Sequence, residues 1–321
     1  MPLTAAFSPN DRVADLLHGA ARLPTIPLEV TSPPPSEIFA SVCQGDGYDV
    51  AEMSLAAHLH RCGHGYDDYV GIPVFTSRAF RHGMVYVRAD SDIKSPVDLN
   101  GKRIVVREWG MTALVWLIGI LTDEHGFDMT TVSWCSLREP RIDVKPPAPI
   151  ALLPPKTCVS TLLGSGEVDA AMVLETPTAF AIDQPNHEQS AVKRLFAHYP
   201  ELERDYWRRT RIHPPMHCVV VRRLALAQYP RLAQELFDTL DDSRQRAIDA
   251  LTDPGVPVAM LPFLAHAVDD TVQMFGKNWW PYGLSTNREA LATLARYAHA
   301  QQLTPDAVDI ENCFLDLRPT A

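Results

Sequence analysis

Short apolar runs rich in β-branched residues alternate along the chain with segments of helical pattern. Leu3–Phe7, Ile26–Val30 and Tyr48–Met53 are typical of buried strands, and each is followed by a stretch whose composition favours a helix. This alternation predicts βαβ units and a largely parallel sheet. The ligand crevice of such a sheet lies at the carboxyl ends of its strands, where Glu52 and Ser54 fall.

The same two patterns continue to the C-terminus. Leu137–Pro155 is too rich in proline, which lacks a backbone N–H, to form a long helix, and Trp279–Gly283 is expected to be an aromatic loop. The further predicted strands are Ile72–Phe75, Met84–Val87, Arg103–Val106, Thr131–Trp134, Val168–Leu174 and the end of Ile212–Arg222. The predicted helices are Asp11–Ala21, Ser36–Gly45, Ser54–Leu59, Gly110–Thr122, Thr157–Leu163, Glu201–Thr210, Leu224–Leu251, Pro262–Gly276 and Asn287–Gln301.

Two crossings between domains are expected. The polar, turn-rich stretch Ala89–Gly101 separates two sets of strand and helix patterns and predicts the first crossing. The strand at the end of Ile212–Arg222 predicts the second crossing, by which the chain returns to the first domain. The sequence therefore predicts two α/β lobes, the first formed by residues 1–88 and 218–321 and the second by residues 89–217.

Charge and composition narrow the class of protein. The chain has 321 residues, 46% of them hydrophobic, and a formal net charge of −10, which argues against a nucleic-acid-binding or anionic-membrane surface. The first residues lack the basic start and apolar core of a secretory signal, and no apolar run approaches the roughly 20 residues of a membrane span. The six cysteines form no Cys-x-x-Cys pair, so reduced thiols in a cytoplasmic protein are expected. A homo-oligomer stays an open alternative.

The stretch Gly71–Arg88 has charged and hydrogen-bonding side chains between two apolar runs. It contains Ser77, Arg78, Arg81 and His82 within six positions. Arginine forks match planar carboxylates, and histidine can move a proton at neutral pH. These residues therefore predict an anion-holding, proton-moving site, with a solvated basic loop as the structural alternative.

A crowded group of possible metal ligands follows the third predicted strand. His58 and Cys62, and likewise His60 and His64, stand at helical spacing, and such pairs can bind zinc. No second ligand set and no His-Glu-x-x-His motif accompanies them. We therefore expect a helix end and loop, with no metal. A metal held by His82, His217 and a glutamate is the other arrangement that the sequence leaves open.

Two stretches, SPVDLNGKRIVV (Ser95–Val106) and LGSGEVDAAM (Leu163–Met172), resemble type II periplasmic-binding-protein-like folds. Five more specific stretches, spread over most of the chain, together resemble the 4,5-dihydroxyphthalate decarboxylase family. They are YDVAEMSL (Tyr48–Leu55), GIPVFTSRAFRH (Gly71–His82), MTALVW (Met111–Trp116), PPMHCVVVRR (Pro214–Arg223) and WPYGLSTNR (Trp280–Arg288). The resemblance implies two α/β lobes that close on a small aromatic carboxylic acid. One carboxylate group of this acid would leave as carbon dioxide, without an organic cofactor.

The chain departs from the family pattern at three places. Thr76–Ser77 stands where Pro-Ser is expected, Trp109–Gly110 follows Glu108 where a Tyr-Gln pair is more usual, and His-Pro-Pro-Met precedes His217. Trp109 and Gly110 fall at a strand-to-helix position that is expected to face the cleft. The substituents of the ring are therefore left open.

Decarboxylation of an aromatic ring requires firm but poorly solvated binding of a carboxylate and a proton delivered to the ring carbon. Under the resemblance, the carboxylate-binding residues are Arg78 and Arg81, supported by Ser77, with surface salt bridges as the alternative. His82 or His217 is the candidate general acid, although a lone histidine is more often structural.

The remaining candidate residues have weaker signals. Glu52 and Glu108 follow strands and could accept a phenolic proton, while Glu108 could instead interact with a helix dipole. Thr112, next to Ser54 and Trp109 in the predicted cleft, could complete a helix N-terminal anion site or only cap the helix. Further candidates are Trp280 and Tyr282 as aromatic walls and, more weakly, Arg141 and Lys156.

Three functions are consistent with these residues. The first is a decarboxylase of a hydroxylated aromatic dicarboxylate that acts by ring protonation. The second is a non-catalytic solute-binding protein of the same fold, which the missing export signal disfavours, and the third is a ligand-sensing module.

Overall fold

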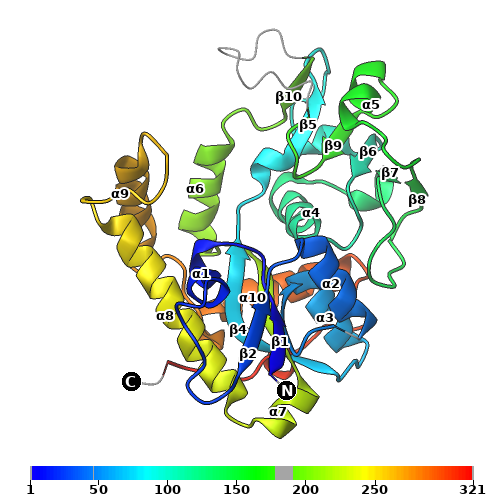
Figure 1. Ribbon diagram of the computed structural model, residues 1–321. Helices are drawn as coiled ribbons and strands as arrows, with labels where there is room; N and C mark the ends of the chain where they lie inside the picture. The colour runs from blue at the N-terminus through cyan, green and yellow to red at the C-terminus, as the bar shows by residue number, and fades with distance from the viewer. Residues whose placement is uncertain (1, 46, 178–190, 320–321) are drawn as a thin grey trace.

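Two β-sheets organise the computed structural model, which describes residues 2–45, 47–177 and 191–319. The first sheet has the order β2-β1-β3-β11-β4 and the second the order β10-β5-β9-β6-β7-β8. Figure 1 shows one sheet in each of two lobes, with β4 rising from one toward the other. The first sheet contains β1 (Leu3–Ala6), β2 (Leu28–Thr31), β3 (Val50–Ser54), β4 (Tyr69–Arg78) and β11 (Pro215–Arg222). The second contains β5 (Val85–Arg88), β6 (Arg103–Val106), β7 (Ser133–Ser136), β8 (Ile150–Leu152), β9 (Ala170–Met172) and β10 (Val192–Arg194).

Helices flank both sheets, as the alternating pattern predicts. They are α1 (Ala14–Leu17), α2 (Pro35–Gln44), α3 (Leu55–Gly63), α4 (Thr112–His125), α5 (Val159–Ser165), α6 (Tyr199–Thr210), α7 (Arg223–Gln228), α8 (Leu232–Thr252), α9 (Leu264–Phe275) and α10 (Leu284–Ala300). The predicted first helix is shorter than expected, because Gly19, at φ +71°, follows its last turn. Two edge strands, β8 and β10, carried no apolar run that would have predicted them. Among the described residues no helix is long and apolar enough to span a membrane.

Each sheet is mixed rather than largely parallel. β1 runs parallel to β2 and β3, but β11 runs antiparallel to both β3 and β4. In the second sheet β6 is parallel to β7 and β9, whereas β5 and β10 pair antiparallel. The antiparallel strands are those next to the two crossings, where the chain enters a sheet from the other lobe.

The sheet topology corrects both predicted lobe boundaries. β5 belongs to the second sheet, so the first crossing lies between Arg78 and Val85 rather than after residue 88. β11 starts at Pro215, and the return therefore precedes residue 218. The polar stretch that suggested a later crossing is a capped turn within the second lobe, where Asp98 accepts hydrogen bonds from the backbone and hydroxyl of Ser95.

Helix α4 ties the lobes together. It follows β6 of the second sheet, yet it packs on α10, and its residues Thr112–Leu121 are buried. Trp116 donates its indole N–H to the Pro215 carbonyl at 2.9 Å, at the start of β11. A side chain at Gly119 would overlap the ring of Tyr297, so glycine allows this close approach. The N-terminus of α4 is thereby fixed at the junction of the lobes.

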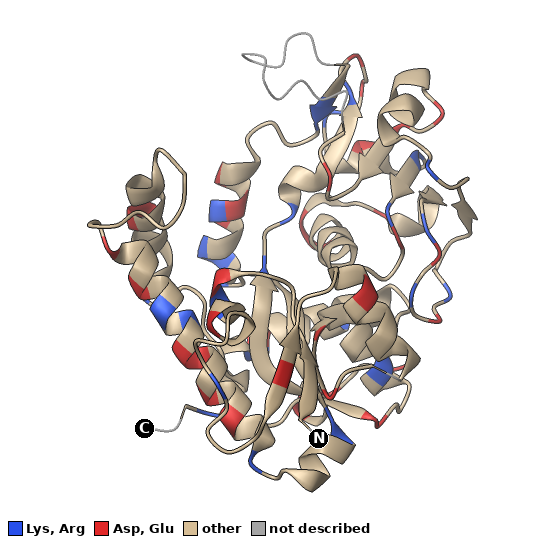
Figure 2. Cartoon of the chain, in the orientation of Figure 1, with Lys and Arg blue, Asp and Glu red and all other residues tan. Residues whose placement is uncertain are grey.

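Charged residues are interspersed on the helices beside this junction. Figure 2 shows acidic and basic positions alternating along α6 and α8 rather than forming one basic face. Arg209 of α6 illustrates the pairing, since it donates to Asp205 one turn earlier and to Glu124 of α4. The arginines of α6 thus contribute to contacts between helices.

Candidate functional site

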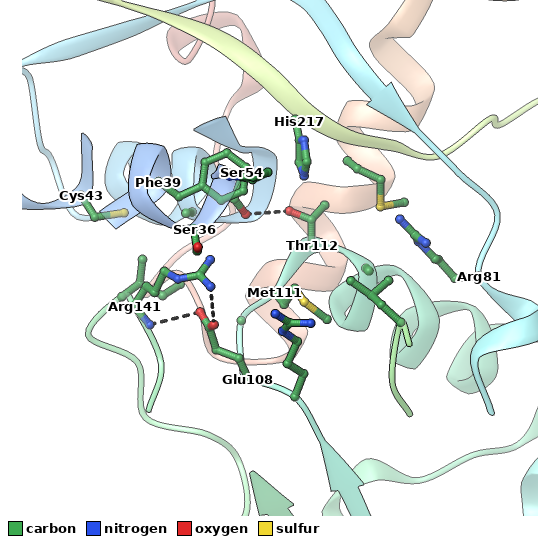
Figure 3. Close-up of a pocket in the computed structure, with 18 residues that line it drawn as sticks. Ser36, Phe39, Cys43, Ser54, Arg81, Glu108, Met111, Thr112, Arg141 and His217 are labelled. Carbon is green, nitrogen blue, oxygen red and sulfur yellow. Dashed lines mark hydrogen bonds and ion pairs between the residues drawn. The ribbon is translucent and has the colours of Figure 1, made fainter. Parts of the chain in front are cut away.

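A cavity of about 300 Å³ lies between the two lobes. The first lobe contributes the start of α2, the junction of β3 and α3, and β11, while the second contributes the β6–α4 connection and the Pro-rich segment. Figure 3 shows these side chains converging from both sides. The lining residues are Pro35, Ser36, Phe39, Cys43, Ser54, Ala57, Arg81, Arg107, Glu108, Gly110, Met111, Thr112, Ala113, Arg141, Ile142, Leu174, Met216 and His217.

His217 faces this cavity from β11 with a carboxylate behind it. Its Nδ1 lies 2.7 Å from Oε1 of Glu52, and its ring packs edge-on against Phe39. Because an ionised carboxylate only accepts, Nδ1 carries a proton, and Nε2 is left to act on a ligand. Such a pair can deliver or remove one proton at a fixed position.

Glu52 is held ionised by its surroundings. Burial favours its neutral form, but the hydrogen bonds from His217 and from the Ser8 backbone outweigh burial and keep the pKa of Glu52 below its ordinary value. The hydroxyl of Thr76 donates to Oε1 as well, at 2.9 Å. Thr76, one of the departures from the family pattern, thus helps to hold the carboxylate that orients His217.

A bulge in β4 positions the neighbours of His217. The register between β11 and β4 shifts on both sides of His217, and the shift spans Pro73, which has no N–H to donate. The carbonyls of the shifted stretch bond outside the ladder: Pro73 accepts from the Gly283 amide, Phe75 from the Trp280 indole, and Thr76 from Nε of Arg12. The bulge is therefore held from outside the sheet, beside the candidate catalytic pair.

Arg81 supplies a half-buried cation at the cavity, and the Glu203 carboxylate is the charge that acts on it. Burial lowers the pKa of Arg81 to about 10, well above neutrality, so the guanidinium stays charged. Its Nε is buried and has no hydrogen-bond acceptor among the described residues. A buried donor without an acceptor is costly, and a ligand carboxylate that accepts from Nε would relieve that cost.

A second group of charges lines the opposite wall. Glu108 forms an ion pair with Arg141, with 3.0 Å between Oε2 and Nη2, and burial raises the pKa of Glu108 above its ordinary value. Arg107 is paired with Glu175. Figure 3 shows Arg141 and Glu108 side by side, across the cavity from Arg81. This wall combines two guanidiniums with one carboxylate of reduced acidity.

Two helix N-termini also face the cavity. Thr112 and Ala113 begin α4 after its N-cap, Met111, and α2 begins with Pro35, which has no N–H, and Ser36. The first amides of a helix lack acceptors within the helix, and the dipole favours an anion there. With the arginines, they make the cavity strongly suited to a small molecule with two negative groups.

Thr112 joins the lobes at the floor of the cavity. Its Oγ1 accepts from the amide of Ala56 at 3.0 Å and lies 2.9 Å from Oγ of Ser54. Ser54, the N-cap of α3, makes no side-chain bond to its own helix. The hydroxyl from the second lobe therefore caps the helix of the first.

Three predicted residues of the Gly71–Arg88 stretch, Ser77, Arg78 and His82, are absent from the cavity lining. Because β4 extends to residue 78, Arg78 points into the protein and donates to the carbonyls of His213 and Pro281 and to Asn287. His82 is buried against Phe196 and Tyr206, with Nδ1 3.8 Å from Glu203. The expected clamp of two adjacent arginines is thus reduced to Arg81.

The predicted aromatic residues do not line the cavity either. Trp109 packs on Trp134 in the second lobe, and Trp280 supports the β4 bulge. Tyr282 is buried with Phe237 beside the Arg244 guanidinium, and burial raises its pKa. Ser77 pairs with His217 across the strands without reaching the cavity lining. Aromatic packing, the structural alternative, describes these side chains.

The structure brings together five of the predicted residues, Ser54, Arg81, Glu108, Thr112 and His217, with Glu52 directly behind. Arg141, a weaker candidate, joins them, whereas Lys156 does not. Sequence reasoning missed Ser36, Phe39, Cys43 and Arg107. Only the charge of Arg107, directly before Glu108 at the end of a predicted strand, could have indicated it. Within residues 2–45, 47–177 and 191–319 there is no cluster of three possible metal ligands.

Two related proteins found by sequence comparison have the same name. The chain is 30% identical over 312 residues to a Comamonas testosteroni protein named 4,5-dihydroxyphthalate decarboxylase, with 95% of this chain and 93% of that protein covered. It is 34% identical over 191 residues to a Pseudomonas putida protein of the same name, covering 57% of this chain and 74% of that protein. No family model matches the chain.

Solved structures of periplasmic binding proteins, or with their fold, align over almost the whole chain. The periplasmic aliphatic sulphonate binding protein of Escherichia coli aligns with a TM-score of 0.56 and 16% identity, over 100% of this chain and 94% of that one. A Candida albicans protein described as having the generic periplasmic binding protein fold aligns with a TM-score of 0.55 and 9% identity, over 100% and 98%. At these identities the likeness concerns the fold alone, which is the predicted two-lobed fold.

Proposed function

Because this chain belongs to the 4,5-dihydroxyphthalate decarboxylase family, we propose that it removes one carboxylate, without oxidation, from a hydroxylated aromatic dicarboxylate. A substrate like 4,5-dihydroxyphthalate would give protocatechuate and carbon dioxide. The observation that carries the proposal is the His217–Glu52 pair, which faces a cavity lined by three arginines and two helix N-termini.

Binding is assigned to the positive groups. In this proposal the Arg81 guanidinium and the first amides of α4 bind one carboxylate, and Arg107 and Arg141, which also line the cavity, attract the second. The apolar side chains of Phe39, Met111, Ile142, Leu174 and Met216 exclude water from the ring. Poor solvation of the departing carboxylate favours its loss as neutral carbon dioxide.

Proton transfer is assigned to His217. In the reacting form, Nε2–H delivers its proton to the ring carbon that bears the departing carboxylate. The carbon–carbon bond then breaks, its electron pair returns to the ring, and carbon dioxide leaves. Glu52 holds the orientation of the imidazole through the hydrogen bond to Nδ1. We assign to Glu108, a lining residue whose pKa is raised by burial, a hydrogen bond to a ring hydroxyl.

The experiment that tests this function compares the wild-type protein with His217→Asn, using 4,5-dihydroxyphthalate and a trap for carbon dioxide. The proposal expects product and carbon dioxide in equal amounts from the wild type, and a large rate loss in the variant. Binding of the acid without release of carbon dioxide would contradict it.

A non-catalytic aromatic-acid-binding or sensing protein is the second candidate. The observation in its favour is the fold, which this chain shares with solute-binding proteins. Such a protein needs the same cations but no proton donor. A thermal shift with the acid that is identical in the wild type and His217→Asn, with no turnover in either, would support it.

A further inference from the structure

An apolar surface lies outside the cavity, on the connection between α8 and α9. Every residue of this connection (residues 253–263) is exposed to solvent. Five of them are large and apolar, each is more than half exposed, and one is fully exposed. Figure 1 places the connection at the outer edge of the molecule, away from both sheets. The five residues are Val256, Val258, Met260, Leu261 and Phe263, of which Met260 is the fully exposed one.

The packing of α9 does not use these side chains. Leu264, Val268 and Phe275 are half-buried and share one face of the helix, which is the face that packs on the protein. At the C-terminal end of α9, the indole N–H of Trp207 in α6 donates to the Met274 carbonyl at 3.1 Å. The rings of Trp207 and Phe275 stack there, with 4.4 Å between centroids. The apolar residues that precede α9 therefore need another explanation.

The connection is stiff. It contains Pro254, Pro257 and Pro262, and each proline ring fixes its own φ angle. At its start, Oδ1 of Asp253 accepts from the Gly255 amide at 2.8 Å. A surface that is already ordered loses less conformational freedom when it binds. The exposed apolar side chains are thus presented for association at a small entropic cost.

Charged residues are missing from this surface. Between Asp253 and Asp269 there is no Lys, Arg, Asp or Glu, although 21% of the whole chain is charged, and Figure 2 draws this stretch in tan. An anionic membrane is disfavoured, because segments that bind it carry Lys and Arg, whereas both ends here are acidic. A different protein would be oriented by complementary charges, which the stretch does not offer.

A second copy of the chain fits this surface. In a two-fold symmetric dimer the same patch meets itself, so a charge near the axis would face its own like charge. The acidic residues stand at the two ends of the stretch, and its centre holds Val258, Met260 and Leu261. Most soluble oligomers consist of identical chains with closed symmetry. An uncharged apolar patch is thus complementary to itself.

The area of the patch approaches what a dimer requires. A large apolar side chain presents on the order of 100 Å² when exposed, so the five together present roughly 400–500 Å². Monomeric proteins rarely expose a contiguous apolar patch of more than a few hundred Å². A standard interface buries about 800 Å² on each partner. Ala259, Ala265, Ala267 and the three prolines are exposed as well, and they extend the patch toward that area.

We propose that residues 253–263 and the start of α9 are the surface through which two copies of this chain form a two-fold symmetric dimer. Met260 and Phe263 of each copy bury against the connection of the other. The contact is separate from the cavity, because none of residues 253–268, all of which the structure describes, belongs to the cavity lining. Self-association can therefore be measured independently of ligand binding.

The test measures the mass of the full chain in solution by sedimentation velocity and light scattering, over about a hundredfold range of concentration. The wild type is expected at twice the 35.7 kDa of one chain. The double variant Met260→Glu with Phe263→Glu places carboxylates that face their own counterparts across the axis. It should weaken self-association at least about 100-fold. Its far-ultraviolet circular dichroism should match the wild type, because both side chains are exposed in the single chain.

Leu224→Glu is the matched control. Leu224 of α7 is apolar and 75% exposed but lies outside the proposed surface, so this variant should remain a dimer. Hydrogen exchange localises the contact, since the amides of residues 254–268 should exchange more slowly in the wild type than in the double variant. A wild type that stays monomeric, or a dimer that survives the double substitution, would overturn the proposal. Sedimentation of single wild-type chains with phosphatidylcholine vesicles would overturn it in favour of a membrane surface.

Discussion

His217 lies diagonally across two antiparallel strands from Glu52, with 2.7 Å between Nδ1 and Oε1. The register pairs His217 with Ser54 and Val219 with Glu52, which places these side chains on one face of the sheet. The pair is therefore built into the centre of the first sheet, while the ring faces the cavity. This geometry gives the imidazole of His217 a fixed position and a fixed tautomer.

Replacement of His217 by Asn should reduce kcat on the order of 10²–10⁴-fold, the usual contribution of a general acid or base. Substrate affinity should change little, because the binding groups are elsewhere. Steady-state kinetics of carbon dioxide release, with the melting temperature as a control for folding, measures this. His82→Asn is the matched control and should keep its rate, since His82 lies outside the cavity lining. Full activity in His217→Asn would show that another residue is the general acid.

The pH dependence of stability should reveal the ionised state of Glu52. Its pKa is held low in the folded protein, so its contribution to stability is present above the unfolded pKa and is lost as pH falls through the folded pKa. Below about pH 5, the free energy of unfolding should therefore fall more steeply for the wild type than for Glu52→Gln. Denaturant titrations at several pH values measure it. Parallel curves would show that Glu52 is not stabilised as a carboxylate.

Arg81→Ala should raise KM strongly or abolish activity while the protein stays folded, because the lost guanidinium has no hydrogen bond to other described residues. Arg81→Lys should recover part of the loss, since it restores the charge but not the planar fork. Calorimetric titration with a non-reacting aromatic dicarboxylate reads the binding directly. Unchanged affinity in Arg81→Ala would exclude this residue from carboxylate recognition.

Arg78→Ala should act on stability instead. It leaves the His213 carbonyl and Oδ1 of Asn287 without their donor, while the Pro281 carbonyl keeps Nδ2 of Asn287, and each buried unsatisfied group costs about 1–3 kcal/mol. The free energy of unfolding should therefore fall by several kcal/mol, measured by urea denaturation. A variant that is as stable as the wild type but unable to bind the acid would show that Arg78 contributes to binding instead.

Thr112→Val should weaken the junction between the lobes. It keeps the shape but loses the acceptor for the Ala56 amide and the bond to Ser54, and the loss of a helix cap costs about 0.5–2 kcal/mol. We expect a lower melting temperature together with a raised KM, because the same atom lies on the cavity floor. Ser54→Ala, which removes only one of the two bonds, is the milder control.

The sequence predicted the two-lobed fold and several residues that line the cavity. It did not predict which of two neighbouring residues of the same type would reach the cavity. Strand and helix periodicity depends on local burial, and it therefore indicated most elements. It did not indicate β8 and β10, because these are three-residue edge strands without a strong apolar run. Arg78 and Arg81 have the same local chemistry. They differ because β4 extends to Arg78, whose side chain is buried, while Arg81 follows the strand into the crossing.

Contacts between the lobes could not be derived from local patterns. Phe39 and Cys43 belong to an ordinary amphipathic helix, and they reach the cavity because α2 packs opposite the start of α4. The bulge beside His217 depends on the absent N–H of Pro73 and on donors from residues 280 and 283. These are consequences of the tertiary fold, so the sequence indicated the residue types without their neighbours.

The central claim is that this cavity catalyses decarboxylation rather than binding alone. The most direct measurement incubates the purified protein with 4,5-dihydroxyphthalate and follows ultraviolet absorbance, product chromatography and carbon dioxide release, beside His217→Asn. Protocatechuate and carbon dioxide are expected from the wild type, and a rate lowered on the order of 10²-fold or more is expected in the variant. A clear thermal shift with the acid, but no product from the wild type, would contradict it.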